Sequence, residues 1–166
     1  PKILVVCTEE RNLTMANGKK FSTGNHPVEA LVPMIHLRNA GFEFDIITPT
    51  GKPAQFELWA MPQEDAEVKQ IYADLKDQIN SPLSLAAFAK NLPKDGADYS
   101  AVFIPGGHGA MIDLPDNDDL GKLIHWAHEQ DLYMITICHG PAALIAANGA
   151  GENRFPYAGY ELTVFP

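Results

Sequence analysis

Residues 135–143, Ile-Thr-Ile-Cys-His-Gly-Pro-Ala-Ala, pass from an apolar strand directly into a helix of small residues. The change falls at Cys138, so its side chain stands at a strand-to-helix turn. This arrangement is that of a nucleophile elbow, in which a sharp turn places one reactive side chain above a sheet. The hydrolase elbow begins with a glycine that is missing here, so the stretch predicts a related design.

Strand-like apolar segments alternate with helix-like segments along the chain. Strands are predicted at residues 2–7, 42–48, 99–104, 132–137 and 160–165. Helices are predicted from an N-cap at Asn25 to Gly41, and at 117–130 and 139–148. This order predicts an α/β fold, in which helices cover both faces of a parallel sheet. A polar region with helical stretches at 63–78 and 82–90 is predicted to be an insertion that lies over the sheet.

The spacing of apolar residues predicts which faces of the two longer helices are buried. In the helix that starts at Asn25, the predicted buried residues are Val28, Leu31, Val32 and Ile35. In the helix at 117–130 they are Leu120, Leu123, Ile124 and Ala127. The aspartates just before and within this second helix are interpreted as a solvated loop and a helix cap; they are Asp113, Asp116, Asp118 and Asp119.

Composition narrows the class of protein. The chain has 166 residues, which suits a single domain, and its 46% apolar content argues against disorder. A net charge of −9 disfavours nucleic acids and anionic membranes as partners, and no apolar run has membrane-spanning length. Two cysteines make no disulfide framework, which favours the reducing cytoplasm. Both ends lie in apolar strands, so we expect residues 1–166 to be the N-terminal part of a longer polypeptide.

The carboxyl ends of parallel strands predict where a functional site lies. They bring together the loop after Cys7, the helix start at Asn25, the turn at 105–109 and Cys138. The turn reads Pro-Gly-Gly-His-Gly and leaves backbone N–H groups bare, which suits an oxyanion pocket. An ordinary strand-end turn has the same composition, so this motif is weak evidence by itself.

Cys138 is the predicted nucleophile. A helix N-terminus stabilises a thiolate, and nearby backbone N–H groups can hold a substrate oxyanion. The alternative is an inert buried cysteine, which we favour for Cys7 because it lies in a core strand. His139 is interpreted as a proton relay or as a group that orients the thiol, with a solvent-bonded histidine at a helix start as the alternative.

Glu29 has two interpretations that the sequence leaves open. Its charge suits the first turn of a helix, and its carboxylate could also face the cleft and take a proton from Cys138 or from a substrate carbon. His125 and His128 have a spacing that could bind a metal, but two ligands are weak evidence and a solvated surface is favoured.

Several ungapped blocks resemble the PfpI superfamily. They read FSTGNHPVE at 21–29, LWAMP at 58–62, VFIPGGHG at 102–109 and CHGPAA at 138–143. The resemblance spans essentially the whole chain. It is strongest to the heat-shock branch, the HchA-type chaperones, glyoxalase III enzymes and protein deglycases.

The resemblance implies a flavodoxin-like fold with a small cap-like helical region at about 56–92, and a homodimer. It implies cofactor-independent conversion of methylglyoxal or glyoxal to the hydroxy acid, repair of glycated proteins and holdase activity on unfolded proteins. By position, it makes Cys138 the nucleophile, Glu29 the acid–base carboxylate and His139 the second member of a triad. Gly107 and His108 then belong to the oxyanion and substrate-binding region.

Two departures from the family pattern affect the expected site. The branch pairs its histidine with an aspartate beyond the last strand, so the third triad member is expected after Pro166 or is missing. Some relatives bind zinc through two histidines and a carboxylate, but the matching positions here are Arg38, Glu43 and Leu75. Arginine and leucine do not ligate zinc as imidazole does, so we predict that no metal binds there.

Two other classes of function remain open. One is a stress chaperone in which Cys138 is a redox sensor, and the other is a cysteine amidase or peptidase. Formation of D-lactate from methylglyoxal, compared between the wild type and Cys138→Ala, separates them from a glyoxalase.

Overall fold

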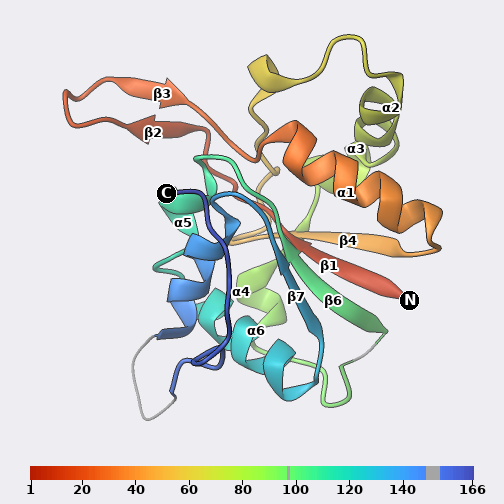
Figure 1. Ribbon diagram of the computed structural model, residues 1–166, viewed down its shortest axis with the longest axis vertical. Coiled ribbons are helices and arrows are strands. Elements are labelled where there is room, and N and C mark those ends of the chain that lie inside the picture. The colour runs from red at the N-terminus through yellow and green to blue at the C-terminus, as the bar shows by residue number, and fades with distance from the viewer. Residues whose placement is uncertain (97, 149–153) are drawn as a thin grey trace.

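A five-stranded parallel sheet forms the centre of the molecule and confirms the predicted α/β class. The computed structural model describes residues 1–96, 98–148 and 154–166 (Figure 1). The strand order is β5-β4-β1-β6-β7. These strands are β1 (Lys2–Val6), β4 (Glu43–Thr48), β5 (Leu83–Ser84), β6 (Tyr99–Ile104) and β7 (Tyr133–Thr136).

Helices cover both faces of this sheet. Figure 1 shows α1, α2 and α3 on one side, with α4 and α6 on the other. The α-helices are α1 (Pro27–Asn39), α2 (Ala66–Asp74), α3 (Lys76–Asn80), α4 (Leu85–Phe88), α5 (Ala110–Asp113) and α6 (Asp118–Glu129). Two 3₁₀-helices complete the set, η1 (Leu58–Ala60) and η2 (Gly140–Asn148).

The core is two apolar layers separated by the sheet, because successive side chains of a strand point to opposite faces. In β1, Ile3 and Val5 pack with α1 and α2, whereas Leu4 and Val6 pack with α6 and η2. The predicted inward residues of α6 are all fully buried: Leu120, Leu123, Ile124 and Ala127.

The buried face of α1 differs from the prediction at two of its four residues, since Val28 is exposed and Val32 is only partly buried. Val28 is 36% exposed, while Ala30 and Met34 are buried with Leu31 and Ile35. The helix begins at Pro27, and the face that meets the sheet follows Pro27 at helical spacing rather than Val28.

The region predicted as a loop after β1 contains a hairpin. Strands β2 (Asn12–Thr14) and β3 (Lys20–Ser22) pair antiparallel and project from the body of the molecule (Figure 1). Asn25 is not the N-cap of α1, as predicted, because His26 takes that place and its Nδ1 accepts from the Glu29 N–H at 3.5 Å. Asn25 is buried and uses its side-chain amide elsewhere.

The segment at 56–92 contains η1, α2, α3, β5 and α4. The predicted helix at 63–78 is interrupted at Leu75, where α2 ends and α3 begins. The predicted helix at 82–90 is shorter, because Leu83 and Ser84 pair with β4 and form an edge of the sheet before α4 starts. The segment therefore extends the sheet as well as adding helices. That it acts as a cap stays a prediction.

The predicted strand at 160–165 is wrong. These residues are exposed and pair with no strand of the described chain. The Phe165 N–H donates instead to the Cys138 carbonyl at 3.0 Å. Alternating apolar residues need a partner strand to form a ladder, and periodicity alone does not provide one. Within the described ranges, no helix combines the length and apolar character needed to cross a bilayer.

Asp113 at the end of α5 is partly buried, which corrects its interpretation as a solvated loop residue. Its carboxylate accepts from the Thr8 hydroxyl at 2.7 Å and from the Glu9 N–H at 3.0 Å. Burial raises the pKa of Asp113 to about 6, although both hydrogen bonds oppose this shift.

We predict that replacing Asn25 destabilises the fold. Its Oδ1 accepts from the Thr8 N–H at 3.1 Å, and its Nδ2 donates to the Gln55 carbonyl at 2.7 Å. Asn25→Ala leaves the buried Thr8 N–H without its acceptor and the Gln55 carbonyl with only the Asn25 backbone N–H, so the free energy of unfolding should fall by about 1–3 kcal/mol in urea titrations. The control Asn17→Ala lies in an exposed hairpin turn and should change it by less than about 0.5 kcal/mol. Equal losses in both variants would contradict this account.

We predict that Asp113 lowers the stability of the folded protein as the pH rises. A folded-state pKa of about 6 lies above the ordinary aspartate pKa of about 3.9, so the folded protein retains this proton better than the unfolded chain does. The associated stability is present in acid and is lost as pH rises through about 6. The stability of Asp113→Asn relative to wild type should therefore increase between pH 4 and pH 7, measured by urea unfolding at each pH. A difference that stays constant with pH would refute this assignment.

Candidate active site

The predicted site segments do meet at the carboxyl ends of β1, β6 and β7. The His26 N–H donates to the Gly106 carbonyl at 3.0 Å, and the Gly109 N–H donates to the Gly24 carbonyl at 3.2 Å. These bonds join the start of α1 to the turn after β6. The loop after β1 joins the same cluster through the contact between Thr8 and Asn25.

Cys138 lies at the strand-to-helix turn between β7 and η2, as predicted. Its φ is +56°, which is uncommon for a residue other than glycine. The Gly140 N–H closes the turn on the Ile137 carbonyl at 2.8 Å. The tight turn keeps the Cys138 side chain partly accessible while the backbone around it is packed.

Gly106 brings Glu29 and Cys138 together. A Cβ at Gly106 would collide with Glu29 Oε2 and would lie 2.8 Å from the Cβ of Cys138. Gly107 has a φ of +101°, and a Cβ there would lie 2.6 Å from the backbone nitrogen of His26. Only glycines fit these two positions, and their missing side chains leave room for the carboxylate beside the thiol.

The Cys138 thiol is held in its neutral form. Burial is the main cause that raises its pKa, and the hydrogen-bonding oxygen and negative charge of Glu29 raise it further. Backbone N–H groups of His139 and Gly107 lower the pKa, but by less. The structure thus differs from the predicted standing thiolate, because desolvation and a neighbouring carboxylate outweigh the N–H groups.

Glu29 is placed to accept a proton. Its Oε2 atom is buried, and no described residue gives this oxygen a partner within ordinary hydrogen-bond geometry. An oxygen that is buried and has no close donor is free to accept a hydrogen from the thiol or from a bound substrate. This supports the cleft-facing interpretation of Glu29 over simple helix-start chemistry.

His139 and His108 form one side of the site. His139 Nδ1 lies 3.6 Å from Cys138 Sγ, so the histidine can exchange a proton with the sulfur. The rings of His108 and His139 have centroids 5.1 Å apart, and Phe165 packs edge-on against His139 at 5.0 Å. The acidic third member of a triad stays a prediction.

Glu57, just before η1, is a site residue that the sequence analysis missed. It is 1% exposed and contacts His108 through both the backbone N–H and the ring. It directly precedes the block at 58–62 that carries the family resemblance, which is the one signal in the sequence. Its partner lies 51 residues away, so local pattern could not pair them.

Cys7 fits the inert interpretation. It is 1% exposed, and burial raises its pKa to about 12, with the charge of Asp113 as a smaller cause. The thiol therefore stays protonated and shielded in the core. Cys138 is the accessible thiol of the described chain.

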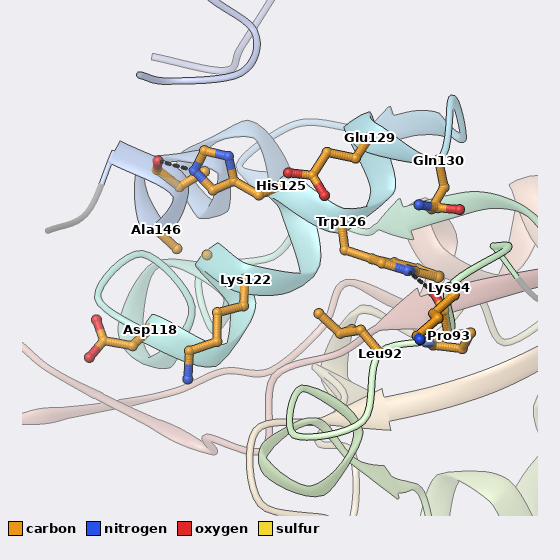
Figure 2. A pocket seen from close by; sticks show the side chains of 12 residues that line it. Leu92, Pro93, Lys94, Asp118, Lys122, His125, Trp126, Glu129, Gln130 and Ala146 are labelled. Atoms are coloured by element: carbon orange, nitrogen blue, oxygen red, sulfur yellow. Dashed lines mark hydrogen bonds between the residues drawn. The ribbon is translucent and has the colours of Figure 1, made fainter. Parts of the chain in front are cut away.

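A hollow of about 600 Å³ lies along α6, away from Cys138 (Figure 2). It contains none of the predicted site residues. Its His125 Nε2–H donates to the Ala147 carbonyl at 3.0 Å, and His128 packs against Tyr157 instead. His125 is partly buried and holds α6 to η2, which differs from the predicted solvated surface, whereas His128 is exposed, as predicted.

The positions that match the zinc ligands of some relatives carry other contacts here. Arg38 donates to Asp74 at 2.8 Å and joins α1 to α2. Glu43 begins β4 and Leu75 is the C-cap of α2. Across the described ranges, no group of three or more histidines, cysteines or carboxylates is arranged to hold a metal ion. The loss of this zinc site stays a prediction from the residue types.

Comparison with known proteins gives consistent matches. The sequence model of the DJ-1/PfpI family matches residues 20–156. The protein/nucleic acid deglycase HchA of Staphylococcus aureus (strain bovine RF122 / ET3-1) is 47% identical over 165 residues, which are 99% of this chain and 56% of that protein. The chain thus spans little more than half the length of this curated relative.

Solved structures show the same fold. Glyoxalase III from Candida albicans matches with a TM-score of 0.64 and 29% identity, over 86% of this chain and 59% of that chain. The 24 kDa rapid encystment protein of Francisella tularensis matches with a TM-score of 0.68 and 25% identity, over 86% of this chain and 60% of that one.

We predict that Glu29 controls the reactivity of Cys138. Since its charge and hydrogen bond raise the thiol pKa, Glu29→Gln should move the pH midpoint of iodoacetamide alkylation to lower pH. Alkylation is followed by mass spectrometry, and buried Cys7 should stay unmodified in the same sample. The control Glu67→Gln removes an exposed carboxylate of α2 and should leave the midpoint in place. An unchanged or higher midpoint in Glu29→Gln would contradict the arrangement.

Proposed function

The chain belongs to the DJ-1/PfpI family, and on that premise we propose that this protein is a glutathione-independent glyoxalase that uses Cys138 as its nucleophile. The observation that carries the proposal is that the Cys138 and Glu29 side chains meet across Gly106, where the Glu29 Oε2 atom is buried and has no close donor among the described residues. That pairing provides a nucleophile and a base in one site. The names of the deglycase and glyoxalase III relatives support the same chemistry.

The first step is attack on the aldehyde carbon of methylglyoxal. The Cys138 proton leaves for Glu29 as the carbon–sulfur bond forms, and the aldehyde oxygen becomes an oxyanion. The N–H groups of Gly107 and His139, which already face the sulfur, are the donors for this oxygen. Protonation of the oxyanion gives a hemithioacetal and returns the carboxylate form of Glu29.

The second step moves hydrogen between the two carbons. Glu29 removes the proton from the hemithioacetal carbon, and the electron pair moves toward the neighbouring ketone to give an enediol. Glu29 returns its proton to the former ketone carbon, and the hydroxyl proton of the sulfur-bearing carbon passes to the former ketone oxygen, which gives a thioester of the 2-hydroxy acid. The aldehyde carbon is oxidised while the ketone carbon is reduced, so no external oxidant or reductant is needed.

The last step releases the product. Water adds to the thioester carbonyl, and the carbon–sulfur bond breaks to give the hydroxy acid and the free thiol. His139, 3.6 Å from the sulfur, is placed to take the proton of the water and give it to the leaving sulfur. The net reaction is methylglyoxal plus water to lactate.

The raised thiol pKa also bears on the alternatives. A redox sensor depends on a standing thiolate at neutral pH, because oxidation follows thiolate character. The neutral thiol beside a base favours a nucleophile that is activated when substrate binds. We propose repair of glycated side chains as a related activity, since their adducts carry the same ketone beside an oxygenated carbon. The proposal also includes a homodimer with holdase activity, which rests on the family resemblance, and a cytoplasmic location, which rests on the two cysteines.

We predict that methylglyoxal turnover by the full-length protein depends on Cys138 and Glu29. Cys138→Ala should abolish D-lactate formation, and Glu29→Gln should lower kcat by about 10²–10⁴-fold, because general-base catalysis contributes in that range. Cys7→Ala is the matched control and should retain activity, since Cys7 is buried away from the site. D-lactate is measured by an enzyme-coupled assay without glutathione. Activity that persists in Cys138→Ala would end the proposal.

A further inference from the structure

Glu57 is a buried carboxylate that the proposed reaction leaves without a role. Its Oε1 accepts from the Thr23 hydroxyl at 2.7 Å, from the His108 N–H at 3.2 Å and from the His108 ring nitrogen Nδ1 at 3.3 Å. Its own backbone N–H is fixed on the Asn25 carbonyl at 3.0 Å. Burying a carboxylate is costly unless donors surround it, so these contacts define one geometry for both partners.

The contact with Glu57 determines which ring nitrogen of His108 is free. A carboxylate only accepts, so Nδ1 carries the hydrogen that bonds to Glu57. Nε2 is then the nitrogen that remains for another partner, which is the way a carboxylate fixes the tautomer and orientation of an imidazole. The His108 side chain is 43% exposed, so this second edge is open to a ligand.

Neighbouring rings keep His108 on the site side of the turn. Phe21 packs edge-on against it with centroids 5.4 Å apart, and Trp59 packs on Phe21 at 6.0 Å. The His139 ring lies on another side at 5.1 Å. His108 also directly follows Gly107, whose N–H faces the Cys138 sulfur.

A dicarbonyl substrate needs a second oxygen-binding group. The N–H groups of Gly107 and His139 account for the oxygen on the carbon that Cys138 attacks. When Glu29 removes the proton from that carbon, negative charge develops on the neighbouring ketone oxygen. A preorganised donor at this oxygen stabilises the transition state.

We propose that Glu57 is a positioning residue that holds His108 so that His108 Nε2 binds the second carbonyl oxygen of an α-oxoaldehyde. The inference rests on the proposed function and names the feature of the substrate that the site recognises. Because Nδ1–H is held by Glu57, donation from Nε2 to the ketone oxygen requires a second proton on the ring, and the Glu57 carboxylate balances the charge of that form while the enediol develops. Among the groups that surround it, Glu57 is the anionic partner, and His139 and Cys138 lie on the substrate side.

The first test uses His108 variants of the full-length protein with methylglyoxal. Loss of one such donor costs about 10²–10³-fold, so kcat of His108→Ala should fall by about 10²-fold while Cys138 alkylation by iodoacetamide is unchanged. Added imidazole should restore part of the lost kcat. His36→Ala, an exposed histidine of α1, is the matched control and should retain full activity.

The second test addresses Glu57 directly. Glu57→Gln keeps an acceptor for Thr23 but cannot hold the imidazolium, so kcat should fall by about tenfold with a smaller change in KM. Two-dimensional ¹⁵N NMR of the wild type should show His108 protonated at Nδ1, and Glu57→Gln should shift this tautomer preference. The wild-type spectrum and His108→Ala decide the matter even if Glu57→Gln does not fold.

The outcomes separate the two proposals. Full activity in His108→Ala, with Cys138→Ala inactive, overturns this inference and leaves the glyoxalase assignment in place. A wild-type His108 protonated only at Nε2 also overturns it. Activity in Cys138→Ala overturns the proposed function and this inference together.

Discussion

The site depends on two consecutive glycines, whose lack of side chains lets three backbone segments approach closely. At Gly106 and Gly107, the turn after β6 passes so close to the start of α1 and to the Cys138 turn that a Cβ at either position would overlap its neighbours. This close approach brings the Glu29 carboxylate to the thiol and places the Gly107 N–H near enough to lower the pKa of Cys138. Preorganised groups of this kind act without rearrangement, which is the main source of electrostatic catalysis.

Two carboxylates, the partly buried Glu29 and the buried Glu57, have different roles around this turn. Glu29 has an oxygen without a close donor and raises the pKa of the Cys138 thiol. It therefore suits the role of the general base. Glu57 accepts from Thr23 and His108 through Oε1, which suits a role in orienting His108. The same residue type has different chemistry because the number of donors around each oxygen differs.

The predictions of secondary structure were wrong where contacts between distant segments determine the local structure. The four core strands and the inward face of α6 follow from local periodicity, and the structure confirms them. The expected strand at 160–165 is absent because no partner strand lies beside it in the described chain. Asn25 has the composition of a helix cap, yet it is drawn into bonds with Thr8 and Gln55, and His26 caps α1 instead.

The sequence by itself determined the α/β class, the strand-to-helix turn at Cys138 and the meeting of the site segments, because strand order and turn composition are local properties. It also identified His139 and Glu29 as candidates, while leaving the role of Glu29 open. Only the tertiary structure decided that the thiol is neutral, because its pKa depends on burial and on a carboxylate more than 100 residues away in the chain. It alone revealed Glu57, since the contact with His108 joins residues 51 positions apart.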